Sequence, residues 1–205
     1  MEAIVGTKES TNTTMAKDCS LAPLLRAVKE GHDRVVELLL KRNDINPDMA
    51  DACGRTPLSW AAGGGHVGIV KLLLGQEFVI PNKLDDCGRT PLSWAAEEGH
   101  DRVVGLLLGL KGIRPDRVGS ACQTPLSWAA RMGHERVVEL LLGRGDVHAE
   151  TVDSAGRTPL SWAVESGCDR VMGYCWNGRT STPMSLINWD EPRSGTLPNM
   201  GSSHW

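Results

Sequence analysis

The chain has 205 residues, of which 40% are hydrophobic and 23% charged, as expected of a globular protein. Its formal net charge of −3 argues against a basic surface for nucleic acid and against a polybasic membrane anchor. No run approaches the roughly 18 to 20 apolar residues of a membrane span, and the N-terminal segment lacks the apolar stretch of a secretory signal. We therefore expect an intracellular protein, cytoplasmic or nuclear, that binds neither nucleic acid nor membrane.

The aromatic residues indicate that one unit has been copied. They comprise seven Trp but only one Tyr and one Phe. The string TPLSWAA occurs at 56–62, 90–96 and 124–130, TPLSWAV follows at 158–164, and each start lies 34 residues after the last. A weaker copy, APLLRAV, stands at 22–28. The spacing predicts a repeat array over residues 19–172, with units starting near 22, 56, 90, 124 and 158, the last of them truncated.

The segments outside the array have a different composition. Residues 1–18 are rich in Thr and Ser, and residues 173–205 contain frequent Pro, Gly and Ser without a leucine run. We expect the first segment to be mobile and the second to be an irregular, disordered tail. The last helix is accordingly expected to end by Met172.

Each unit predicts two short helices. Thr56 is a good N-cap and Pro57 is favoured at the first helical position. Gly65 ends this helix, and the apolar stripe that closes in the leucines 72–74 predicts a second one. The Pro, Asp and Gly residues that follow predict an extended segment and a turn. Two helices of this length are marginal alone, so the stability must come from stacking of neighbouring units.

The T-P-L-x-x-A start and the Gly-His pair that follows the first helix resemble the ankyrin repeat. The tetratricopeptide repeat has a similar period but lacks both features. The resemblance implies an all-α solenoid of helix-turn-helix units joined by β-turn or hairpin loops. The wording GRTPLSWAAEEGHDRVVGLLL at 88–108 looks most like ankyrin arrays of filamentous fungi, which often follow a nucleotide-binding switch domain. A regulatory arm or fragment of such a sensor protein is therefore one alternative for this chain.

The 34-residue period separates framework residues, which recur from unit to unit, from residues that occur only once. His32, His66, His100 and His134 share one position in the repeat, which favours a turn residue that bonds backbone over a catalytic or metal-binding role. Cys19, Cys53 and Cys87 share another position, and the chain has no C-x-x-C pair, so neither disulfides nor a zinc site are expected. We expect no enzymatic activity, cofactor or metal. An enzyme with accessory repeats is a remote alternative, since its tail would have to carry the chemistry.

The repeated Trp has two interpretations. Trp60, Trp94, Trp128 and Trp162 each precede a buried alanine, so stacked units would form a ladder of partly buried rings. Arg26 takes this position in the first unit and would end the ladder at a soluble cap. The alternative is an aromatic strip that contacts a partner peptide.

The resemblance implies a function in binding a protein partner through a concave groove lined by turn tips and first helices. Candidate contact residues are those that vary between units or lie in the turns. These are Asp51, Arg55, Asp85, Asp86, Arg89, Glu97, Glu98, Gln123, Arg131, Met132, Arg157 and Glu165. The groove would be acidic around Asp85, Asp86, Glu97 and Glu98. We expect a monomer, and nothing in the sequence names the partner.

Overall fold

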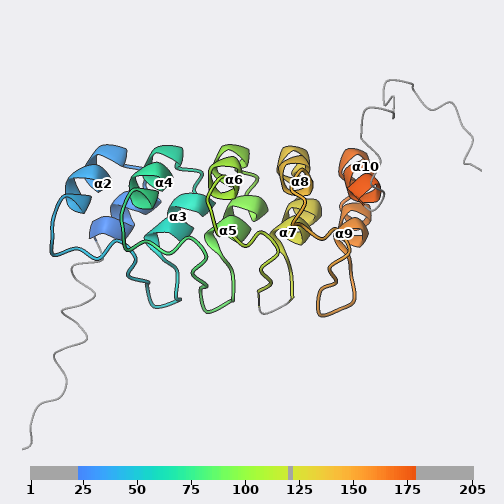
Figure 1. Ribbon diagram of the computed structural model, residues 1–205, viewed down its shortest axis with the longest axis horizontal. Coiled ribbons are helices and arrows are strands. Elements are labelled where there is room, and N and C mark those ends of the chain that lie inside the picture. The colour runs from blue at the N-terminus through green and yellow to red at the C-terminus, as the bar shows by residue number, and fades with distance from the viewer. Residues whose placement is uncertain (1–22, 120–121, 179–205) are drawn as a thin grey trace, which may run out of the picture.

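The chain forms a linear stack of helix pairs, seen in a computed structural model that describes residues 23–119 and 122–178. Each pair consists of an inner and an outer helix, and long loops project to one side of the stack (Figure 1). The inner helices are residues 23–29, α3 (Pro57–Gly63), α5 (Pro91–Glu97), α7 (Pro125–Met132) and α9 (Pro159–Glu165). The outer helices are α2 (Asp33–Leu40), α4 (Val67–Leu74), α6 (Asp101–Leu108), α8 (Glu135–Leu142) and α10 (Asp169–Gly178).

The inner helices begin where the Thr-Pro pairs predict. The Thr56 hydroxyl accepts a hydrogen bond from the Ser59 backbone N–H at 3.1 Å, and Pro57 fills the first helical position. The two hydroxyls also lie 3.1 Å apart, so the serine of each LSW string belongs to the cap. The same cap recurs in α5, α7 and α9. This arrangement fixes the position on the helix of the Trp that follows the serine.

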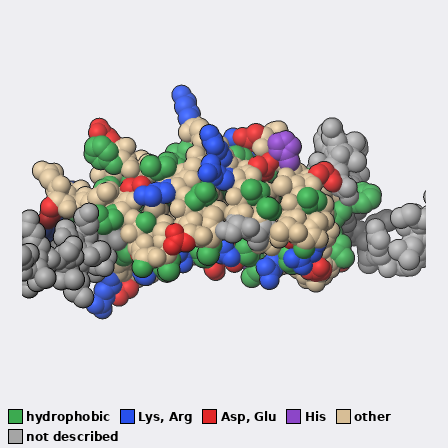
Figure 2. Space-filling model, turned by 90° about the horizontal axis from the view of Figure 1, so that it is seen from below, with side chains coloured by type: hydrophobic (Ala, Val, Ile, Leu, Met, Phe, Trp, Pro, Cys, Tyr) green, Lys and Arg blue, Asp and Glu red, His purple; other side chains and the backbone are tan. Residues whose placement is uncertain are grey.

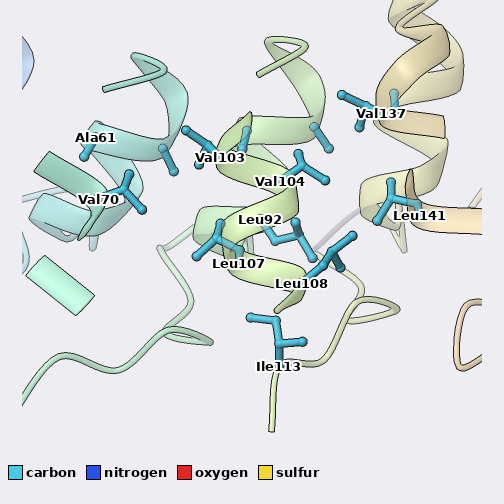
Figure 3. Close-up of a cluster of buried hydrophobic side chains, with 14 of the residues drawn as sticks. Ala61, Val70, Leu92, Val103, Val104, Leu107, Leu108, Ile113, Val137 and Leu141 are labelled. Carbon is cyan, nitrogen blue, oxygen red and sulfur yellow. The ribbon is translucent and has the colours of Figure 1, made fainter. Parts of the chain in front are cut away.

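The core runs continuously along the stack because each unit buries its apolar residues against its neighbours. Figure 3 shows part of it, where Leu92 of α5 meets Leu107 and Leu108 of α6, with Ile113 from the following loop below. Leu92 and Leu107 have no exposed surface. Burial of such a side chain stabilises the fold by roughly 1.5–3 kcal/mol. In this stack, much of the surface that buries it belongs to the adjacent units.

A second set of contacts joins the projecting loops. Asp48 accepts a bond from the Ile80 backbone N–H at 3.3 Å, Asn82 from Arg114 at 3.0 Å, and Asp116 from His148 at 2.7 Å. Each acceptor lies 34 residues after the previous one. Every such side chain therefore holds the backbone of the next loop, which sets the spacing of the loops as well as that of the helices.

The end of the array differs from the sequence prediction. The helix expected to end by Met172 continues as α10 to Gly178. It does so because Val171 and Cys175, one helical turn apart, are both buried. Cys175 takes the position of the buried leucines Leu73, Leu107 and Leu141 of the other outer helices. The predictions for residues 1–18 and for 179–205 lie outside the described residues.

The described helices are also too short to act as membrane spans. Within residues 23–119 and 122–178, none has the length and apolar character needed to cross a bilayer.

Candidate functional site

The turn aspartates expected to contact a partner are bonded within their own unit. One oxygen of Asp85 accepts bonds from the backbone N–H groups of Cys87 at 3.0 Å and Arg89 at 2.8 Å. The other oxygen accepts the indole N–H of Trp94 at 2.9 Å. Asp51 makes the equivalent bonds to its own turn and to Trp60. These carboxylates therefore shape the turn and orient the Trp, and Asp85 is buried.

The pKa of Asp153, the equivalent aspartate of the last unit, reflects these hydrogen bonds. Burial acts to raise the pKa of Asp153, but bonds from the backbone N–H groups of Arg157 and Ala155 and the charge of Arg157 outweigh it and lower this pKa. Trp162 donates to the same carboxylate at 3.2 Å. The turn thus binds the ionised form of its aspartate.

Between the repeated indoles lie cations. The guanidinium of Arg55 lies 3.5 Å from the Trp60 ring centroid and 3.7 Å from that of Trp94, in the next unit. Arg89 lies in the same way between Trp94 and Trp128, at 4.5 and 4.1 Å. We call the alternating series the indole–cation ladder. Its members are, in order, Lys29, Trp60, Arg55, Trp94, Arg89, Trp128, Arg131, Trp162 and Arg157.

This ladder corrects two details of the sequence interpretation. The expected contact of ring with ring is replaced by ring, cation and ring, since the indole face attracts a positive charge. Lys29, and not Arg26, lies over the first ring, at 3.7 Å from its centroid. Arg26 is exposed and pairs with Glu30 at 3.0 Å. The sequence does indicate a framework role for Arg55 and Arg89, because these two residues also lie 34 positions apart.

The fourth unit, which starts near residue 124, breaks the ladder's regular pattern. Gly119 stands where the other turns carry Asp, and Gln123 stands where they carry Arg. Arg131 of α7 takes over, with its guanidinium 5.5 Å from the Trp128 centroid and 4.7 Å from that of Trp162. Gln123, a predicted contact residue, is buried.

Glu97 and Glu165 continue the ladder toward the ends of the inner helices. Glu97 is half-buried and forms an ion pair with the guanidinium of Arg89. Burial raises the pKa of this carboxyl, although the charge of Arg89 opposes the shift. Glu165 is more exposed and lies 3.9 Å from the equivalent Arg157. Both glutamates therefore support the ladder from its edge.

Three of the four repeated histidines bond backbone across the unit boundary, whereas His32 contacts Glu30 of its own unit. His100 Nε2 lies 3.0 Å from the carbonyl oxygen of Gly63, and His134 Nε2 lies 2.8 Å from that of Glu97. Each ring also packs against the Gly of the preceding Gly-His pair, for example His134 against Gly99. Among the described residues no group of three His, Cys, Asp or Glu side chains could hold a metal ion. The described cysteines are all free thiols.

A comparison with protein families identifies this architecture. The family model described as ankyrin repeats (3 copies) matches residues 24–119 and 117–174. The chain belongs to the ankyrin repeat family. No curated protein matches it. The ankyrin assignment, which the Thr-Pro starts and Gly-His pairs favoured over the tetratricopeptide alternative, is thus confirmed.

Two positions of the repeat remain exposed along the ankyrin array, and the type of side chain at each changes from unit to unit. The equivalent residues at one position form a column along the stack. One lies in the turns and the other at the ends of the inner helices. We call them the variable columns: Ala52, Asp86 and Ser154 in the turns, and Gly64, Glu98, Met132 and Ser166 at the helix ends. Of the predicted contact residues, Asp86, Glu98, Arg131, Met132 and Glu165 are exposed. The others are half-buried or buried in the ankyrin framework, namely Asp51, Arg55, Asp85, Arg89, Glu97, Gln123 and Arg157.

Proposed function

We propose that the chain is a non-enzymatic interaction module that binds a protein partner along its turns and inner-helix ends. Ankyrin repeats are generally protein–protein interaction modules, and the chain belongs to that family. The observation that carries the proposal is the exposure of the variable columns. Gly64, Glu98 and Met132 occupy one repeated position and are all exposed, yet they are small, acidic and apolar in turn.

The fixed residues beside these columns support a binding role in a different way. The guanidinium of Arg89 is held by Trp94, Trp128 and Glu97, so the surface next to Glu98 is ordered before a partner arrives. An ordered surface loses less conformational entropy on binding. The proposed groove therefore consists of a rigid indole–cation floor and a variable rim.

The exposed residues at the rim indicate which kinds of side chain a partner would place against them. Asp86 and Glu98 are exposed in the third of the five units, whereas Arg131 and Met132 are exposed in the next one. A partner that follows the groove would place a cation near the acidic pair and an apolar side chain near Met132. Such complementary charge increases association rate and specificity more than affinity.

Affinity capture with the full chain tests the proposal. We expect Glu98→Lys/Met132→Asp to lose partners that the parent chain retains. Lys71→Glu/Arg102→Glu serves as the control, because both residues are exposed on the outer helices α4 and α6. Circular dichroism should verify that all three proteins are equally helical. Identical partners for parent and groove variant would refute the groove, and loss of partners with the outer-helix control would move the interface to that face.

A further inference from the structure

A second surface lies on the underside of the array, in the loop that follows α6. This loop carries Lys111, Arg114 and Arg117. The equivalents of Arg114 are Asn46, Ile80 and His148, and those of Arg117 are Met49, Lys83 and Thr151. Lys83 is already bound to Asp48, at 2.8 Å. The repeat framework does not account for these cations, because they occur together in one loop only.

Arg114 and Arg117 line an open depression of about 560 Å³. Its apolar part consists of Leu84, Ile113, Pro115 and Val118. Figure 2 shows this side of the molecule, with Lys and Arg side chains gathered near the middle of the array. We call this feature the basic depression. None of its lining residues belongs to the indole–cation ladder or to the variable columns.

Neither acidic residue that lines the basic depression forms an ion pair with its arginines, although one carboxylate oxygen of Asp116 has no hydrogen-bond partner among the described residues. Asp146 binds Arg144 through two hydrogen bonds of 2.7 Å. Asp116 accepts the His148 backbone N–H at 2.7 Å and also contacts its imidazole. Within residues 23–119 and 122–178, neither Arg114 nor Arg117 makes an ion pair with another described side chain. The lining therefore presents two available guanidinium groups beside apolar surface.

We propose that the basic depression binds a short acidic segment of a partner protein that carries an aliphatic side chain between its carboxylates. Guanidinium groups match carboxylates in two-point hydrogen bonding, and Leu84, Ile113 and Val118 provide contact for the aliphatic group. No aromatic side chain lines the depression, so a nucleic acid base would find no ring on which to stack. The site is separate from the proposed groove, and either can fail without the other.

A peptide array tests this proposal with the full chain. The probes are heptapeptides with leucine or glycine at the centre and glutamate, serine or lysine on both sides, together with an eight-nucleotide single strand. We expect the glutamate–leucine peptides to bind best and to weaken as salt rises from 0.05 to 0.5 M. Arg114→Asn/Arg117→Thr should weaken their binding by about twofold to thirtyfold, as expected for the loss of two exposed ion pairs.

The substitutions use residues that the chain itself tolerates, since Asn46 and Thr151 occupy the equivalent positions. Lys71→Gln/Arg102→Gln removes the same charge from the outer helices and should leave binding unchanged. Equal binding of glutamate–glycine peptides would eliminate the apolar contact and overturn the proposal. Unchanged binding by the arginine variant, absence of binding to glutamate–leucine peptides, or stronger binding of the oligonucleotide would also overturn it.

Discussion

The guanidinium of Arg55 lies 3.7 Å from the centroid of the Trp94 indole ring, although the two residues belong to different units. The same guanidinium covers Trp60 in its own unit at 3.5 Å. One half-buried side chain thus connects two consecutive inner helices. Because repeat arrays depend on the interfaces between units, such bridges contribute to cooperativity as well as to local order.

Removal of this bridge should destabilise the array. Arg55→Ala eliminates two cation–π contacts, and we expect the free energy of unfolding to fall by about 1–2 kcal/mol. Urea denaturation followed by circular dichroism measures the change. Arg102→Ala is the matched control, because Arg102 is exposed on α6 and contributes no stacking contact. Equal effects of the two substitutions would show that the ladder adds nothing to stability.

Gly99, which precedes α6, and Gly105, which lies within it, should respond in opposite directions to alanine. Gly99 has φ +77°, and a Cβ there would lie 2.5 Å from Nδ1 of His134. Gly105 lies within the helix, and a Cβ there meets nothing within 4 Å. Gly99→Ala should therefore cost more than about 1 kcal/mol, and Gly105→Ala should gain about 0.5–1 kcal/mol. Paired thermal melts would check both signs, and stabilisation by Gly99→Ala would contradict the proposed packing of His134.

The third turn contains Cys122, and a substitution there can relieve the strain of its left-handed backbone conformation. Cys122 has φ 54°, whereas the equivalent positions Gly54, Gly88 and Gly156 carry glycine at φ 69–75°. Because a left-handed backbone costs a side-chain-bearing residue about 1 kcal/mol or more, we expect Cys122→Gly to stabilise the array by roughly 0.5–1 kcal/mol. Denaturation midpoints of parent, Cys122→Gly and Cys122→Ala would test this. The alanine variant should remain close to the parent, since it keeps the strained backbone.

The sequence predicted the framework because the framework is local and repeated. The Thr56–Ser59 cap and the His100 contact depend on neighbours at fixed separations, so a 34-residue period was sufficient to indicate them. The direction of the turn aspartates was not predictable in this way. Asp85 looks like a solvated tip in sequence, but its position relative to Cys87, Arg89 and Trp94 turns it inward.

The basic depression and the end of α10 escaped prediction for different reasons. Arg114 and Arg117 are three residues apart in a loop with no regular structure, so only the fold shows that they share a depression with Leu84. Cys175 does not resemble the leucine it replaces, so the absence of a leucine run predicted an end of the helix earlier than Gly178. Both cases depend on tertiary contacts that residue type alone does not reveal.

The last prediction concerns this buried thiol. Burial raises the pKa of Cys175 from 9.0 to about 12, whereas Cys53, Cys87 and Cys122 are exposed. At pH 9 the folded protein should therefore react with iodoacetamide at the three exposed thiols and spare Cys175, because the thiolate is the nucleophile. Peptide mass mapping before and after unfolding in urea measures each site separately.

The same shift gives a dependence of stability on pH. The folded state retains the Cys175 proton to a higher pH than the unfolded state does, so this contribution is complete below about pH 9 and is lost as the pH rises toward 12. Cys175→Ala should weaken the array at neutral pH, since it leaves a cavity beside α8 and α9, but should show a smaller loss of stability between pH 8 and pH 10 than the parent. A parallel decline of both proteins, or rapid labelling of Cys175 in the folded state, would place this thiol in contact with water and refute its packing in the leucine position.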